Sequence, residues 1–195
     1  MQPLPSWLQI SNVDFRSNIT KEQFLEHYES KGLPVVLTDV VTTWSAYRTW
    51  TKEYLMTLCG NRLFTAGSVS LSLADFFKIS ETIGDNSLYI FDKRFGEKVT
   101  ELVADYVVPD YFSEDLFSVL GKNRPDYRWL VIGGRYSGST FHIDPIATSA
   151  WNAVIRGKKK WILFPPGTVP PGVIPSEDLD SVATPESVLE WYLHV

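Results

Sequence analysis

The sequence predicts a mainly β domain with helices in its N-terminal part, an α+β arrangement. Capped amphipathic segments occur before residue 84, and short β-rich runs separated by tight turns follow from residue 128. Such runs are typical of a sandwich or barrel rather than of a parallel α/β sheet. The chain has 195 residues, of which 44% are hydrophobic, so it is long enough and apolar enough for one core.

The first helix has the clearest start signal. Thr20 and Gln23 stand three residues apart and match a capping box. Gly32 can close this helix, because glycine adopts the left-handed conformation that often follows a helix. The apolar run at residues 34–38 then predicts a buried strand.

Three further helices are expected. One starts near Thr51 and ends at Gly60 with its apolar residues on one face, and the next follows Ser72. The last covers residues 185–194, with Thr184 as its cap and a proline in its first turn.

The predicted strands lie mostly in the second part of the chain. Runs at residues 88–91 and 128–132 are rich in β-branched and aromatic residues. Three more runs follow at hairpin spacing, at residues 140–144, 149–155 and 158–164. We therefore expect one structural domain in which an N-terminal helical region, residues 1–84, packs on a β core formed by residues 85–195.

Composition excludes several classes of protein. The net charge of −5 argues against nonspecific nucleic-acid binding, but it suits a basic protein partner such as a histone tail or a Lys/Arg-rich segment. Charges and prolines interrupt every apolar stretch, so no membrane partner is expected, and the N-terminus lacks the pattern of a signal peptide. The single cysteine, Cys59, favours a reducing compartment, the nucleus or the cytoplasm.

His142 and Asp144 are the strongest candidates for chemistry. Residues two apart in a strand share a face, so this imidazole and carboxylate point the same way. Together they could provide two ligands of a facial-triad iron(II) site. The alternative is a surface histidine beside a turn aspartate. Asn152 and Lys159 follow on the next two predicted strands, and alternation allows Lys159 to point inward while its two lysine neighbours point outward. A solvated hairpin edge is the other interpretation of these lysines.

The runs Phe141–Pro145, Thr148–Asn152 and Gly157–Pro165 together resemble the JmjC (cupin-type) iron(II)- and 2-oxoglutarate-dependent oxygenases. The chain looks most like the group of the bifunctional arginine demethylase and lysyl hydroxylase and its F-box-containing relatives. The resemblance implies a double-stranded β-helix, or jelly-roll, core that is incomplete at its C-terminal end. It also implies hydroxylation of a protein side chain, lysine or arginine, or demethylation through hydroxylation.

Site residues follow from the resemblance. His142 and Asp144 match iron(II) ligands, and Lys159, rather than Lys158 or Lys160, matches the lysine that pairs with the distal carboxylate of 2-oxoglutarate.

Four other residues are candidates for contact with this co-substrate. Asn152 and Tyr89 match contacts found in this group, while Ser139 or Thr140 lies where a threonine hydroxyl helps to hold the co-substrate. The other substrates implied are O2 and a protein.

The third iron ligand has no match. The only histidine downstream is His194, which falls in a predicted helix and is not expected to bind metal. Three explanations remain open. The chain is a fragment or truncated isoform of a longer oxygenase, or another polypeptide or a second copy of this chain supplies the remaining strands. The third explanation is a non-enzymatic interaction module.

Overall fold

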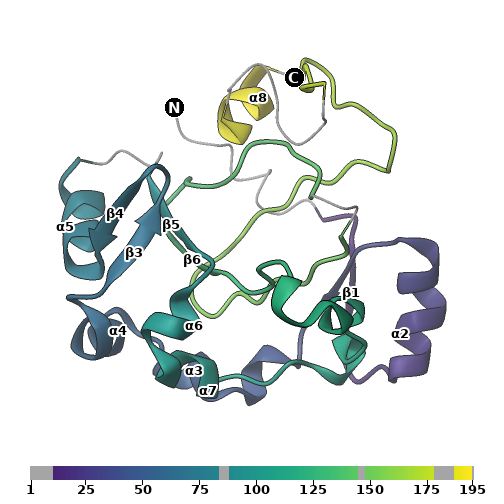
Figure 1. Ribbon diagram of the computed structural model, residues 1–195. Coiled ribbons are helices and arrows are strands. Elements are labelled where there is room, and N and C mark those ends of the chain that lie inside the picture. Colours follow the sequence, from purple (N-terminus) through teal and green to yellow (C-terminus); the bar gives the residue numbers. More distant parts are fainter. Residues whose placement is uncertain (1–10, 84–87, 145–147, 178–186, 195) are drawn as a thin grey trace.

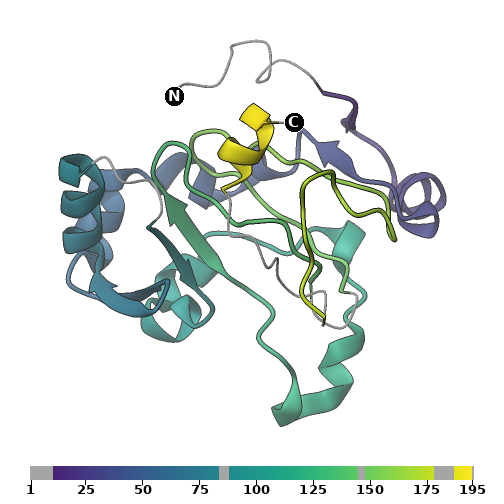
Figure 2. The ribbon, with the colours of Figure 1, turned by 90° about the horizontal axis from the view of Figure 1, so that it is seen from above.

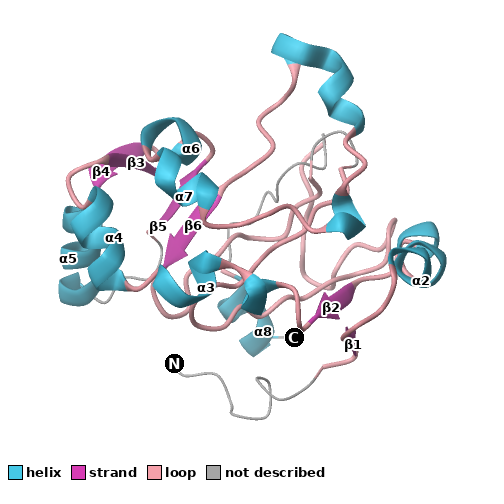
Figure 3. Cartoon of the chain, turned by 90° about the horizontal axis from the view of Figure 1, so that it is seen from below, coloured by secondary structure: helices cyan, strands magenta, loops and turns pink. Residues whose placement is uncertain are grey.

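The computed structural model describes residues 11–83, 88–144, 148–177 and 187–194. Helices α4 and α5 and strands β3 to β6 lie together at one side, while α2, β1 and β2 lie at the other (Figure 1). Long loops fill the space between β6 and β2 (Figure 3). No helix in the described ranges is both long and apolar enough to cross a membrane.

The described helical segments run from the N-terminal part to the end of the chain. The α-helices are α2 (Lys21–His27), α3 (Ser45–Thr49), α4 (Lys52–Cys59), α5 (Leu73–Ile83), α6 (Phe95–Lys98), α7 (Thr100–Ala104) and α8 (Val188–His194). The 3-10 helices are η1 (Glu29–Lys31), η2 (Val41–Thr43), η3 (Asp110–Phe112) and η4 (Leu116–Asn123).

Within the described residues, six short strands pair into three two-stranded sheets. The first sheet is parallel, and the other two are antiparallel. The pairs are β1 (Asp14–Arg16) with β2 (Val35–Leu37), β3 (Leu63–Ala66) with β4 (Val69–Ser72), and β5 (Tyr89–Asp92) with β6 (Leu130–Gly133).

The helix starts predicted from Thr20, Thr51 and Ser72 are confirmed. Gln23 donates its backbone N–H to Thr20 Oγ1, and the Thr20 N–H donates back to Gln23 Oε1, a complete capping box. Thr51 caps α4 and Ser72 accepts from the first turn of α5. Helix α8 starts later than predicted, after Ser187, whose hydroxyl accepts the Glu190 N–H. The predicted cap of this helix lies outside the described residues.

The core forms where α4, α5 and the turns of α6 and α7 cover one face of β3 and β5. Its side chains come from both sides of the predicted boundary at residue 84, so the two regions share one core. The large apolar side chains that are less than 2% exposed are those of Phe64, Leu73, Phe76, Ile90 and Leu102.

A buried carboxylate ties the strands to α6. Asp92, only 1% exposed, accepts hydrogen bonds from the backbone N–H groups of Thr65 and Arg94 and from the Lys98 ammonium. Burial acts to raise the Asp92 pKa, but these three donors outweigh burial and hold it below its usual value. The carboxylate therefore stays ionised within the core.

The prediction of three strands after residue 139 is wrong for the described part of the chain. The segments expected at residues 140–144, 149–155 and 158–164 run without ladder hydrogen bonds. A strand needs a neighbour that offers N–H and C=O groups, and no described segment occupies that place. The described residues consequently contain a mixed α+β arrangement of small sheets and not the expected jelly roll.

Candidate metal and co-substrate site

The loop that follows β6 brings His142 and Asp144 together. The distance from His142 Nε2 to Asp144 Oδ1 is 3.4 Å, and both side chains are about half exposed. On its other side the imidazole Nδ1 lies 2.7 Å from the Thr140 carbonyl oxygen. Because a carbonyl oxygen only accepts, Nδ1 is the donor in this contact, and Nε2 is the ring nitrogen that faces Asp144 and that a metal ion could bind.

This pair fits a first-row metal ion. Ligand atoms about 2.1 Å from a metal and at right angles to each other lie about 3 Å apart. The observed separation of 3.4 Å is close to this value. A neutral imidazole whose far nitrogen donates to a carbonyl, beside a carboxylate, is a donor set that suits iron(II). The convergence expected from the spacing is thus present, although the residues lie in a loop and not in a strand.

A third ligand is not found in the described ranges, where no three His, Cys, Asp or Glu side chains gather in a metal-binding group. His27 ends α2, and His194 ends α8 as predicted, but the side chain of His194 is outside what the structure describes. The described residues therefore provide two candidate ligands.

Tyr89 and Ser139 meet, although 50 positions separate them. Tyr89 stands on β5, and its hydroxyl lies 3.1 Å from Ser139 Oγ. This hydrogen bond joins the sheet to the loop that carries His142 three residues later. Thr140 contributes its carbonyl to the His142 imidazole, so Ser139 contacts the tyrosine and Thr140 contacts the histidine.

Lys159 does not take the buried position that alternation predicts. Its side chain is exposed, and its ammonium lies 4.2 Å from the centre of the Trp161 ring. Desolvation by the surrounding chain nevertheless lowers the pKa of this amine. Among the described residues it forms no salt bridge, so it is a partly desolvated cation that an anionic ligand would stabilise.

Asn152 is exposed on the segment at residues 149–155 and, within the described ranges, forms no hydrogen bond with Tyr89 or Lys159. The tryptophan before it anchors the segment: the Trp151 ring stacks on Phe112 at 5.6 Å and meets Trp44 edge-on at 6.0 Å. The structure thus places Asn152 by packing and does not connect it directly to the other candidates.

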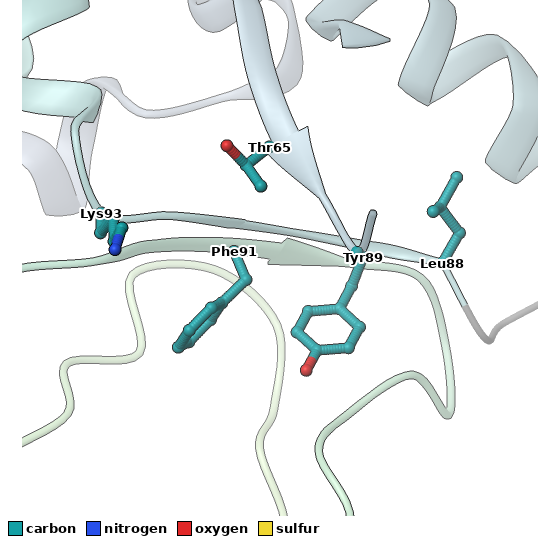
Figure 4. Close-up of a pocket in the computed structure, with 6 residues that line it drawn as sticks. Thr65, Leu88, Tyr89, Phe91 and Lys93 are labelled. Carbon is teal, nitrogen blue, oxygen red and sulfur yellow. The ribbon is translucent and has the colours of Figure 1, made fainter. Parts of the chain in front are cut away.

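The sequence interpretation missed two aromatic residues on the face of Tyr89. Phe91 and Trp129 stack with ring centres 6.0 Å apart, and both are more than 40% exposed. Figure 4 shows the side chains of Tyr89 and Phe91 on the same side of β5. They border a pocket of about 380 Å³ that Thr65 and Lys93 also line. Alternation along β5 was the signal that could have identified Phe91.

Comparison with known proteins finds strong similarity along nearly the whole chain. It is 47% identical over 191 residues to the arginine-specific demethylase JMJ22 of Arabidopsis thaliana, covering 97% of this chain and 38% of that protein. It is 39% identical over 167 residues to the bifunctional arginine demethylase and lysyl-hydroxylase psr-1 of Caenorhabditis elegans, covering 80% of this chain and 42% of that one.

A shorter match covers 48% of this chain and 23% of the 2-oxoglutarate and iron-dependent oxygenase JMJD4 of Mus musculus, at 35% identity over 99 residues. No family model matches the chain. The chain spans less than half the length of these curated relatives.

Proposed function

Because this chain is homologous to JmjC arginine demethylases and lysyl hydroxylases, as its motifs predict, we propose that it carries the iron(II) and 2-oxoglutarate site of such an oxygenase. The observation that carries the proposal is the convergence of His142 and Asp144 at 3.4 Å, with the imidazole oriented by the Thr140 carbonyl. The same loop reaches Tyr89 through Ser139.

Each candidate residue has a defined task in this proposal. His142 and Asp144 hold the metal through Nε2 and a carboxylate oxygen. Lys159 binds the distal carboxylate of 2-oxoglutarate, because a partly desolvated ammonium gains most from a paired anion. The hydroxyls of Tyr89 and Ser139 contact the co-substrate from the sheet side: one donates to the co-substrate, and the other donates to its partner hydroxyl.

Asn152 and the hydroxyl of Thr140 are the further co-substrate contacts that we propose. When bound, iron(II) with 2-oxoglutarate and O2 supplies the oxidation of an unreactive C–H bond to C–OH, with succinate and CO2 as the other products. The protein's part is to position the substrates and to exclude water from them.

We propose a protein substrate with a lysine or arginine side chain. Two relatives are named arginine demethylases, and one of these is also named a lysyl-hydroxylase. The acidic net charge of −5 favours association with a basic segment, in the nucleus or the cytoplasm.

Turnover requires a third metal ligand from outside the described residues, and we propose that it comes with the strands that complete a β-helix around residues 140–164. The absence of ladder bonds along these residues, within the described chain, is the observation that favours this arrangement.

A second candidate function is a non-enzymatic interaction module. The observation that favours it is that only two candidate metal ligands gather in the described chain. Under this alternative the exposed residues of the loop region serve association, and the chain binds its partner without chemistry.

The test is formation of succinate from 2-oxoglutarate with added iron(II), using peptides that contain lysine, arginine or methylated arginine. We expect turnover when the strands that supply the third ligand are present together with this chain, and we expect a peptide to stimulate it and His142→Ala to abolish it. His27→Ala is the matched control, because it removes an imidazole at the end of α2 and should leave turnover unchanged. Absence of turnover with retained peptide binding would favour the interaction module.

A further inference from the structure

Helix α8 rests on the segment that carries the metal pair. Trp191 is 8% exposed, and its ring meets Phe141 edge-on with centres 4.9 Å apart. Phe164 completes the group, at 6.0 Å from Phe141 and 6.1 Å from Trp191. Three rings from three separate segments therefore pack mutually edge to face, the arrangement that aromatic rings prefer. Figure 2 shows α8 lying over the loops that follow β6.

One hydrogen bond of its indole and the cap of its helix position Trp191. Its indole Nε1 donates to the carbonyl oxygen of Pro171 at 2.6 Å. The hydroxyl of Ser187 accepts the Glu190 N–H, while the Glu190 carboxylate accepts the Ser187 N–H, so the helix has its own capping box. The indole is thus held by its helix on one side and by the preceding loop on the other.

Phe141 is the residue directly before His142, which gives this contact its significance. Residues 140–144 have no ladder hydrogen bonds in the described chain, so side-chain packing has to fix their backbone. The Phe141 ring anchors this segment on Trp191. The hydrogen bond between His142 Nδ1 and the Thr140 carbonyl joins the residues on either side of Phe141. A rotation of the backbone at residue 141 would change that hydrogen bond and the separation of His142 from Asp144.

We propose that Trp191 is a positioning residue for the metal site and that it acts through Phe141. The inference rests on the proposed function, since it assumes that His142 and Asp144 bind a metal ion. Trp191 keeps the segment ordered, so that His142 Nε2 and the Asp144 carboxylate stay close together before a metal ion binds. Because the segment is already ordered, less conformational entropy is lost on binding.

The test is the affinity of the whole chain for Mn(II), a redox-inert stand-in for iron(II), in Trp191→Phe, Phe141→Leu and the double variant. We expect each single variant to weaken binding about tenfold, the lower end for residues that orient metal ligands. Because both substitutions break one contact, the double variant should lose no more than either single one.

Trp50→Phe is the matched control. Trp50 is also buried and also donates its indole N–H to an oxygen, Asp105 Oδ2 at 2.8 Å, but it lies in the core beside α3. Both tryptophan variants should lower the melting temperature, whereas only Trp191→Phe should weaken Mn(II) binding. The NMR signals of the His142 imidazole in metal-free protein should shift in Trp191→Phe and stay unchanged in Trp50→Phe.

Two results separate the possible failures. If the unsubstituted chain binds Mn(II) no better than His142→Ala, the proposed metal site is wrong and the positioning role falls with it. If the unsubstituted chain binds Mn(II) through His142, but Trp191→Phe binds equally well and leaves the His142 signals in place, the metal site stands and the role of Trp191 is refuted.

Discussion

Two regions of the molecule differ in burial and in strand pairing. We call residues 44–133 the packed region and residues 134–177 the open region. The packed region buries Phe64 and Ile90 completely and pairs four of its strands. In the open region, Trp161 and Leu163 are each more than half exposed, and the described backbone forms no strand beyond a single bridge residue, Pro175. The packed region therefore accounts for most of the buried apolar surface that stabilises the fold.

The candidate chemistry lies almost entirely in the open region. His142, Asp144, Asn152 and Lys159 all belong to it, and only Tyr89 stands on a strand of the packed region. A few side-chain anchors hold the open region against the packed one. Stability and site geometry should therefore respond to separate sets of substitutions.

The largest expected effect contrasts an apolar residue from each region. Phe64→Ala should cost about 3–5 kcal/mol of unfolding free energy, because it empties a fully buried position in the packed region. Leu163→Ala should change it by less than about 0.5 kcal/mol, because that side chain is already half exposed. Urea unfolding of both variants provides the measurement. Equal losses of unfolding free energy in the two variants would contradict the difference between the packed and open regions.

The next effect concerns the carboxylate of the packed region. Asp92→Asn should cost about 3 kcal/mol, since it leaves the Lys98 ammonium and two backbone donors poorly paired. The folded-state pKa of Asp92 is lowered, so its contribution is complete above the unfolded value of about 3.9 and is lost as the pH falls through the lower folded value.

Unfolding free energy measured from pH 7 to pH 2 provides the check for Asp92. The difference between the unsubstituted chain and Asp92→Asn should stay constant down to about pH 4 and shrink below it. A difference that grows on acidification would contradict the ionised state assigned to Asp92.

A smaller effect is expected where the packed region meets the open one. A Cβ atom at Gly133 would lie 2.0 Å from Ser137 Oγ and 3.3 Å from Tyr89 Cβ, whereas one at Gly138 would meet no atom within 4 Å. Gly133→Ala should cost about 1–2 kcal/mol and weaken 2-oxoglutarate binding, because it displaces Tyr89 and the turn before Ser139. Gly138→Ala is the control, and titration calorimetry with a melting curve measures both. Equal 2-oxoglutarate affinities and melting temperatures in the two variants would show that position 133 tolerates a side chain.

The smallest effect tests an anchor of the open region. Arg156 donates Nε to the Trp50 carbonyl at 3.2 Å and a terminal nitrogen to the Arg48 carbonyl at 2.9 Å, at the end of α3. Arg156→Ala should cost about 1 kcal/mol and raise amide exchange in residues 150–164, with little change around β3. Lys158→Ala is the control from the same exposed turn. Uniform exchange changes in both regions would contradict a local anchor.

The sequence was most informative where structure is local. Thr20, Thr51 and Ser72 predicted helix starts correctly because a cap and its helix are neighbours along the chain. The spacing of His142 and Asp144 likewise predicted that their side chains lie close together, and they do so in a loop although the prediction assumed a strand.

Long-range features could not be read in the same way. Alternation showed which side chains of residues 158–164 share a face, but it could not show whether another strand covers that face, and Lys159 is exposed as a result. The contact between Trp191 and Phe141 joins residues 50 positions apart that are connected by loops. No periodic pattern in such loops predicts that the two rings meet. The stacking of Phe91 on Trp129 depends in the same way on strand register.

In the proposed site, His142 and Asp144 hold a metal ion and Lys159 binds 2-oxoglutarate. The most direct measurement is a titration of the chain with Co(II), followed by its visible absorption, with and without 2-oxoglutarate. We expect a His142-dependent signal that 2-oxoglutarate changes, that Lys159→Ala makes insensitive to 2-oxoglutarate, and that His27→Ala leaves intact. A Co(II) signal that persists unaltered in His142→Ala would contradict the account.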